Sequence, residues 1–245
     1  AKAGRCVSIS TRLSTRNALS SVERGKMNPS PQESMCNWAD PPLDYAQCYC
    51  EENIWKLCMR AKIAGADLKN IFAVFISNPQ QQVQLLKQRA GQAEDNWSVV
   101  WDYHVVLVTH LDSISMVIDP DSVLGLQTDF DDYVSQTFVQ PTCILGYFKP
   151  LFRVIGADVY IDEFASDRSH MMAKDGRFLQ TPPSWPHIVN KHGELMNLSK
   201  FVAMSDRGVG DVLHYEQLVK RFSNSNKSDQ SNLLVGHRIH LLLMH

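Results

Sequence analysis

The sequence predicts an α+β fold in which one helix precedes a group of strands. The helix is expected from about residue 50, because apolar residues recur there at the i, i+3, i+4, i+7 spacing of one buried stripe. These residues are Ile54, Leu57, Cys58 and Ala61. Runs of strand-forming residues follow at 71–77, 100–109, 114–119 and 151–155. Strands grouped after a helix favour α+β over an alternating β-α-β arrangement.

The remaining elements are expected to be short. Residues 80–90 predict a short helical or loop stretch between the first two strands. Further short helical patterns lie at 158–164, 198–203 and 215–222. Two polar breaks, at 28–42 and 223–232, bound this region, so we expect one folded domain over residues 43–222.

Composition narrows the class of protein. With 44% hydrophobic and 20% charged residues, the 245-residue chain can bury a substantial core. A net charge of −2 gives no reason to expect nucleic acid or an anionic membrane as a partner. No apolar run approaches the roughly 18 residues that a membrane-spanning helix needs. The six cysteines follow neither a disulfide-scaffold nor a zinc-ligand spacing, which predicts a reducing compartment and no bound metal.

Cys50 is the candidate nucleophile. It lies four residues before Ile54, at the N-terminal end of the predicted helix stripe. Unpaired backbone N–H groups and the positive end of the helix dipole favour a thiolate there, and the thiolate is the nucleophilic form. The same N–H groups could hold an oxyanion. The alternative is that Cys50 is a small apolar filler, as buried cysteines usually are.

His104 and Asp119 are the candidate base and its orienting carboxylate. If the strands at 100–109 and 114–119 form a hairpin that turns near 111–112, residues whose numbers sum to about 223 face each other, as His104 and Asp119 do. Directly opposed residues share one face of the sheet, although a one-residue slip would separate them. The alternatives are a structural histidine and a turn-forming aspartate before Pro120. Together with Cys50 the pair has the logic of a catalytic triad.

Several motifs resemble one known family. They are CYCEENIWKLC (48–58), FAVFISN (72–78), WDYHVVL (101–107), FRVIGADVYIDEFASDRSHM (152–171) and MNLSKFVAM (196–204). In this order they resemble the eukaryotic protein N-terminal glutamine amidohydrolases, over roughly residues 44–222. The resemblance assigns that family's Cys-His-Asp triad to Cys50, His104 and Asp119. It also implies a papain/transglutaminase-like fold, in which the helix bearing the cysteine packs on an antiparallel sheet bearing the histidine and aspartate.

The resemblance implies a hydrolase that deamidates the side chain of N-terminal glutamine on proteins or peptides. The reaction would release ammonia through a thioester, need no cofactor, and feed the N-degron pathway. We expect a monomer in the cytoplasm and nucleus. Two alternatives stay open: a papain-like cysteine protease or transglutaminase that uses the same triad, and a non-catalytic peptide-binding module.

A carboxylate is expected to hold the substrate's α-ammonium, because that charge distinguishes an N-terminal glutamine from an internal one. The candidates are Glu51, Glu52, Asp102 and Asp167. Asp102 is slightly favoured, since it lies two residues before His104 on the expected strand. The alternative for Glu51 and Glu52 is that they complement the helix dipole. In the ASDRSHM motif, we expect an ion pair of Asp167 with Arg168 and a supporting role for His170.

The two ends of the chain differ from the centre in composition. Residues 1–42 are predicted to be a disordered N-terminal extension, 43–222 the catalytic domain, and 223–245 a low-complexity C-terminal tail. Residues 1–26 are rich in basic residues and serine, which is typical of an organelle presequence. A start at Met27, or a disordered leader, is the favoured interpretation.

Overall fold

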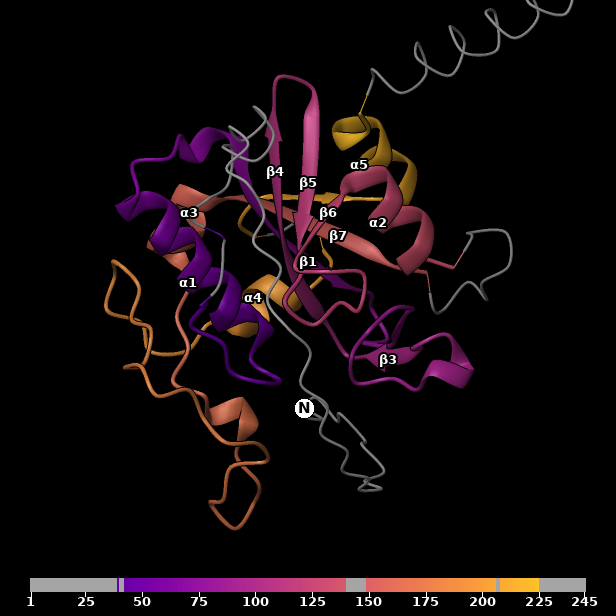
Figure 1. Ribbon diagram of the computed structural model, residues 1–245. Helices are drawn as coiled ribbons and strands as arrows, with labels where there is room; N and C mark the ends of the chain where they lie inside the picture. The colour runs from indigo at the N-terminus through magenta and orange to yellow at the C-terminus, as the bar shows by residue number, and fades with distance from the viewer. Residues whose placement is uncertain (1–38, 40–41, 140–148, 206–207, 225–245) are drawn as a thin grey trace, which may run out of the picture.

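One antiparallel sheet of six strands forms the centre of the molecule (Figure 1). The computed structural model describes residues 39, 42–139, 149–205 and 208–224. The predictions for residues 1–26, for nearly all of the N-terminal extension and for the tail beyond residue 224 therefore lie outside the described residues. The strand order is β6-β5-β4-β1-β7-β8, and a separate two-stranded sheet pairs β2 with β3.

The elements have the following bounds. The strands are β1 (Ile71–Ser77), β2 (Val83–Leu85), β3 (Val99–Trp101), β4 (His104–Leu111), β5 (Ile114–Ile118), β6 (Gln127–Asp129), β7 (Leu151–Gly156) and β8 (Asp211–Leu213). The α-helices are α1 (Cys50–Ile63), α2 (Phe130–Thr137), α3 (Ala157–Glu163), α4 (Leu198–Val202) and α5 (Tyr215–Phe222). Short 3₁₀ helices lie at Leu68–Asn70, Ala93–Asp95 and Ser169–Met171. The predicted α+β class is confirmed.

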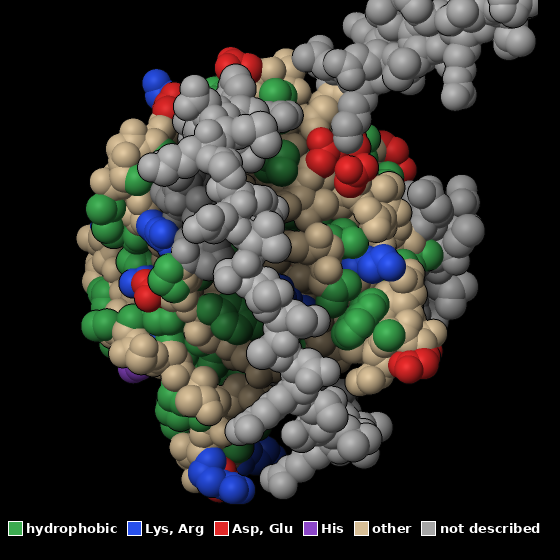
Figure 2. Space-filling view, viewed as in Figure 1, with side chains coloured by type: hydrophobic (Ala, Val, Ile, Leu, Met, Phe, Trp, Pro, Cys, Tyr) green, Lys and Arg blue, Asp and Glu red, His purple; other side chains and the backbone are tan. Residues whose placement is uncertain are grey.

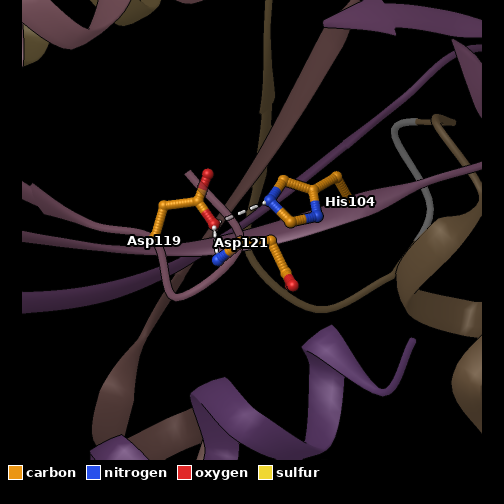
Figure 3. A group of neighbouring side chains, drawn as sticks. All are labelled: His104, Asp119 and Asp121. Carbon is orange, nitrogen blue, oxygen red and sulfur yellow. Dashed lines mark hydrogen bonds and ion pairs between the residues drawn. The ribbon is translucent and has the colours of Figure 1, made fainter. Parts of the chain in front are cut away.

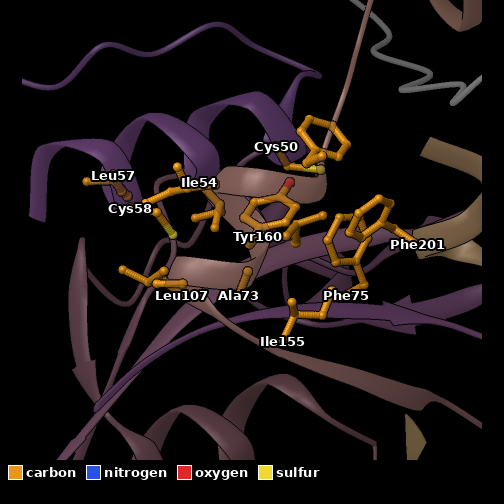
Figure 4. Packing of buried hydrophobic residues seen from close by; sticks show 14 of the residues in the cluster. Cys50, Ile54, Leu57, Cys58, Ala73, Phe75, Leu107, Ile155, Tyr160 and Phe201 are labelled. Atoms are coloured by element: carbon orange, nitrogen blue, oxygen red, sulfur yellow. The ribbon is translucent and has the colours of Figure 1, made fainter. Parts of the chain in front are cut away.

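Helices cover both faces of the six-stranded sheet (Figure 1). One apolar cluster joins α1, α3 and α4 to alternate strand residues such as Phe75 and Leu107. Figure 4 shows Cys58 on α1 directed toward Leu107 on this face. The other cluster joins α2 and α5 to the intervening residues, such as Val74 and Val106. Because both faces are buried, β1 and β4 are apolar along most of their length instead of alternating with polar residues.

Helix α1 begins and ends at defined backbone features. The residue two places before it, Cys48, has a positive φ of 66°, which turns the chain into the helix. At the other end Gly65 has a φ of 76°. The Gly65 N–H donates to the Lys62 carbonyl at 3.1 Å, and the Ala66 N–H donates to the Ala61 carbonyl at 3.0 Å. These two bonds form a Schellman motif, which uses glycine because a side chain disfavours positive φ.

The hairpin of β4 and β5 has a different register from the one predicted. Leu111 pairs with Ile114 and Leu107 with Ile118, so facing residues sum to 225 and the value of 223 is wrong. The turn residues Asp112 and Ser113 both have positive φ, as in the two-residue type I′ turns that suit hairpins. Since the error is two residues and not one, each side chain keeps the face that was predicted for it.

Two other predictions need correction. The expected strand at 100–109 is two strands, because Asp102 and Tyr103 interrupt it between β3 and β4. The stretch 80–90 is neither helix nor simple loop, since it contains β2, which pairs with β3. Short edge strands of three residues carry too little periodic pattern to be recognised from sequence. The same reason applies to β6 and β8, which were not predicted.

Candidate active site

Cys50 is held at the first position of α1 by a closed loop. The side-chain amide of Asn53 accepts from the Ala46 N–H and donates to the Ala46 carbonyl, both at 2.8 Å. Asn53 thereby ties the segment before the helix to its first turn. No side chain caps the helix at Tyr49, so the Cys50 thiol lies beside backbone N–H groups without a side-chain acceptor. Cys50 is 7% exposed and belongs to the apolar cluster under α1.

The electrostatic surroundings of Cys50 differ from the prediction. Burial raises the pKa of the Cys50 thiol well above its usual value, and the negative charges of Glu51 and Asp121 raise it further. A hydrogen bond with the backbone of Val105 acts in the opposite direction. Unpaired backbone N–H groups and the helix dipole were expected to favour the thiolate, and that expectation omitted the burial of the thiol and the two neighbouring carboxylates. The thiol therefore needs a further partner to ionise.

His104 and Asp119 form a buried ion pair, shown in Figure 3. The His104 Nε2 atom lies 3.1 Å from Oδ1 of Asp119, and both side chains are at most 1% exposed. Burial acts to lower the pKa of His104, but the charge and hydrogen bond of Asp119 dominate and raise it. The other ring nitrogen, Nδ1, is buried without a hydrogen-bond partner. His104 is thus a strong proton acceptor with one free position.

Asp119 is fixed by three further donors. Tyr133 donates its hydroxyl to Oδ2 at 2.8 Å, and Gln88 donates its side-chain amide to the same oxygen at 3.3 Å. The Asp121 N–H donates to Oδ1 at 3.0 Å. Although burial acts to raise the pKa of Asp119, His104 and these donors lower it. Asp119 therefore stays a carboxylate and holds the imidazole in one orientation.

Cys50 lines a small pocket, and His104 lies next to two residues of that lining, although the two side chains come from opposite faces of the sheet. Strand alternation places His104 on the α2 and α5 face, whereas Cys50 comes from α1 on the other face. They share neighbours because His104 is the first residue of β4, at the end of the sheet. Trp101 and Asp121 line a small pocket with Cys50. Trp101 also stacks on the His104 ring, with 5.3 Å between the ring centroids. A carboxylate oxygen of Asp121 lies within 4.8 Å of a ring nitrogen of His104.

Asp121 was not among the predicted site residues. Its carboxylate accepts from the Tyr45 hydroxyl at 2.5 Å, and burial raises its pKa, helped by the charge of Asp119. The corrected hairpin register contains the missing signal, because 104 and 121 sum to 225. The strand pairing itself ends at Leu107 and Ile118, and a turn follows from Asp119 to Ser122.

Glu51 is a buried carboxylate beside the thiol. Its Oε2 atom lies 3.7 Å from the Cys50 sulfur and accepts from the Tyr103 hydroxyl at 3.0 Å. Among the described residues none donates a hydrogen bond to its Oε1 atom, and the His170 Nε2 atom lies 3.4 Å away. The distance satisfies an ion pair, but the geometry is not that of a hydrogen bond, so we treat Oε1 as lacking a donor.

Glu52 has a different environment, although it is also fully buried. Arg168 donates to both of its carboxylate oxygens, with the shortest contact at 2.9 Å. Ser166 and the Trp185 indole N–H also donate to it, at 2.9 and 2.8 Å. This network engages the carboxylate on the side of α1 that faces the segment 166–186. Both glutamates lie in the first turn of α1, where the dipole interpretation places them, and both are fully buried.

The other two candidate carboxylates lie in different places. Asp102 lines the pocket with Cys50, and burial raises its pKa. Asp167 accepts from the Ser169 N–H and is not among the residues that line this pocket. The predicted ion pair of Asp167 with Arg168 is wrong, because Arg168 points inward to Glu52. His170 lies next to Glu51, as a supporting residue of the site would.

The ligand atoms of His104, Asp119 and Asp121 lie within 4.8 Å of one another and are the one group among the described residues that could hold a metal ion. His104 and Asp119 hydrogen-bond each other, and Asp121 accepts from Tyr45. The arrangement is that of an oriented imidazole.

Among the described residues, no helix combines the length and apolarity that crossing a membrane requires. On the face drawn in Figure 2, basic side chains form small separate groups instead of one patch.

The chain is similar to known proteins over most of its length. A sequence model of the N-terminal glutamine amidase family matches residues 45–222. The protein N-terminal glutamine amidohydrolase of Bos taurus is 43% identical over 195 residues, which cover 77% of this chain and 92% of the relative. The protein of the same name from Drosophila melanogaster is 39% identical over 184 residues, covering 74% of this chain and 89% of the relative.

Proposed function

Because this chain belongs to the N-terminal glutamine amidase family, we propose that it deamidates the side chain of an N-terminal glutamine on proteins or peptides. The products are N-terminal glutamate and ammonia. The main observation behind the proposal is a pocket lined by Cys50 together with Trp101 and Asp121, which lie next to the His104–Asp119 pair. The pocket is also acidic, since Asp102 and Asp121 line it and no Lys or Arg does. That charge suits a substrate bearing an α-ammonium.

The first step uses the free nitrogen of His104. The Cys50 proton passes to Nδ1, which has no other partner, and the thiolate attacks the side-chain carboxamide carbon. Asp119 on Nε2 stabilises the imidazolium that forms. The raised pKa of His104 offsets the raised pKa of the thiol, because proton transfer depends on the difference between them.

The second step needs donors for the oxyanion of the tetrahedral intermediate. Backbone N–H groups at the start of α1 are one source, since no side chain caps that end. We assign the second donor to the indole N–H of Trp101, which is buried, lacks an acceptor and belongs to a residue that lines the pocket. A buried donor without a partner is costly unless a ligand completes it.

The intermediate then collapses to a thioester. The carbon–nitrogen bond breaks, the imidazolium of His104 donates its proton to the departing ammonia, and Cys50 keeps the acyl group. His104 next removes a proton from water, which attacks the thioester carbon and releases the glutamate product and the thiol. The chemistry is that of papain-like and transglutaminase-like enzymes, in line with a cysteine helix packed on an antiparallel sheet. We place the product in the N-degron pathway, in the cytoplasm and nucleus.

Glu51 is our choice among the carboxylates for the α-ammonium. Its Oε1 atom is buried without a hydrogen-bond donor among the described residues, whereas the Glu52 carboxylate accepts five hydrogen bonds and Asp167 lies outside the pocket lining. Asp102 and Asp121 add negative charge around the bound cation. Extended glutamine spans about 5 Å from its carboxamide carbon to its α-nitrogen. This length is compatible with Glu51, whose nearer oxygen is 3.7 Å from the sulfur.

Mass spectrometry of a glutamine-starting peptide incubated with the protein tests the proposal. The expected result is the mass change of an amide converted to an acid, confined to residue one. Cleavage of the chain or cross-linking to an amine would instead indicate a protease or a transglutaminase. An unchanged peptide would indicate a binding module. The Cys50→Ala and His104→Ala variants should be inactive while remaining folded, and wild-type activity in either would refute the mechanism.

A further inference from the structure

The charge balance around Glu51 is incomplete in the unliganded protein. The carboxylate is fully buried, and within the described residues no Lys or Arg pairs with it. Tyr103 supplies its one hydrogen bond at normal distance, to Oε2. His170 approaches Oε1 without hydrogen-bond geometry. A buried carboxylate in these surroundings is costly and lacks a cation.

The same carboxylate is in contact with the nucleophile and accepts a hydrogen bond from its thiol. Glu51 Oε2 lies 3.7 Å from the Cys50 sulfur, and a thiolate there would place two negative charges in contact inside the protein. Like charges at such a distance disfavour ionisation strongly when both are buried. Glu51 therefore opposes formation of the nucleophile for as long as it has no counter-ion.

We propose that the α-ammonium of the substrate activates Cys50 by neutralising Glu51, so that one carboxylate both recognises the N-terminus and restrains the thiol until it is bound. This inference rests on the proposed function. The ammonium supplies the cation that Glu51 lacks and removes the repulsion on the thiolate. The thiol proton passes to Nδ1 of His104, and the ammonium keeps its own proton throughout. An internal glutamine, which has no ammonium, would leave the restraint in place.

Other groups around the thiol also influence the pKa of Cys50. Asp102 and Asp121 also raise the pKa of Cys50, but Glu51 is the stronger of the charged contributors. The backbone of Val105 hydrogen-bonds the sulfur and favours the thiolate. His104 accepts the proton, and His170 and Tyr103 face Glu51 from the other elements. The restraint should therefore weaken, and not vanish, when Glu51 alone loses its charge.

The rate of alkylation of Cys50 by iodoacetamide, followed by peptide mass spectrometry against pH, tests the restraint without any substrate. In the wild type, the rate should rise only above the ordinary cysteine pKa of about 8.5. Glu51→Gln removes the charge and keeps the shape, so the profile should move to lower pH, with alkylation at pH 7 about ten-fold faster for each unit of the shift. Asp112→Asn, the same change at the tip of the β4–β5 hairpin, should leave the profile unchanged.

A second measurement compares two peptides on the wild-type protein and on Glu51→Gln. A peptide that begins with des-amino glutamine keeps the carboxamide and lacks the ammonium. Its kcat should fall by at least ten-fold relative to the glutamine peptide, and Glu51→Gln should reduce that difference. A kcat equal for both peptides, with only KM changed, would show that Glu51 is an anchor alone. An alkylation profile that Glu51→Gln does not move would overturn the proposal even if the protein deamidates glutamine. Movement of the profile in a protein that does not deamidate glutamine would instead refute the proposed function.

Discussion

Glu51 and Glu52 are consecutive, fully buried carboxylates on the first turn of α1, yet their surroundings differ. Glu52 receives hydrogen bonds from Arg168, Ser166 and Trp185 and so joins the helix to the segment 166–186. Glu51 has one hydroxyl donor, the nucleophile beside it and an oxygen without a donor. A satisfied buried charge supports the fold, and an unsatisfied one in a pocket is available to a ligand.

The largest effect is expected on the pocket side, from Asp119→Asn. The amide cannot stabilise the imidazolium of His104, and loss of this role typically lowers kcat by about 10⁴-fold. The free energy of unfolding should change less than the activity, since Tyr133 and Gln88 can still contact the residue. Steady-state kinetics and urea denaturation measure the two quantities. Equal losses in both would assign Asp119 a structural role.

On the Glu52 side, Arg168→Met should destabilise the fold by about 3–5 kcal/mol, because it leaves a buried carboxylate without its cation. Urea denaturation measures this loss. The double variant Glu52→Leu with Arg168→Met removes both charges and should recover most of the stability. By contrast, Glu51→Gln should cost little stability. If Arg168→Met and Glu51→Gln destabilised the protein equally, the contrast between the two carboxylates would be lost.

Two tryptophans allow the same comparison with neutral donors. Trp101→Phe removes the unpartnered indole N–H at the pocket and keeps a ring over His104, so kcat should fall by about 10²-fold with little change in KM. Trp185→Phe removes the N–H that Glu52 accepts at 2.8 Å, and it should lower stability while leaving kcat unchanged. A kcat that survives Trp101→Phe would exclude this indole as the oxyanion donor.

The smallest effect is expected from Tyr103→Phe. It removes the hydroxyl that donates to the Glu51 carboxylate, which should cost about 1 kcal/mol of unfolding free energy. With less stabilisation, the Glu51 charge should act more strongly on the thiol, so Cys50 alkylation should slow at a given pH. Faster alkylation in Tyr103→Phe would mean that the hydroxyl, and not the carboxylate, restrains the thiol.

The sequence predicted the long elements and the chemistry of the site better than its connections. Periodic apolar spacing identified α1, and strand propensity identified β1, β4, β5 and β7. The hairpin register was wrong by two residues, because the turn type depends on the backbone angles of Asp112 and Ser113, which composition does not determine. Cys50, His104 and Asp119 were all singled out, and His104 and Asp119 are in contact.

Long-range contacts account for what the sequence could not supply. Arg168 lies 116 residues from Glu52, and spacing along the chain favoured its neighbour Asp167 instead. Trp101 was not singled out because its position over His104 depends on the break between β3 and β4. The thiol pKa was predicted in the wrong direction, since the helix start was considered without the burial of the thiol and without the charges of Glu51 and Asp121.

The tight turn at Asp112 and Ser113 offers a practical handle on this protein. It closes the end of the β4–β5 hairpin opposite to His104 and lies at the far side of the sheet from β3 in Figure 1. A fluorophore or a short epitope grafted there would extend into solvent without touching the cysteine, the imidazole or the acidic pocket. Folding and turnover could then be followed separately on one labelled molecule.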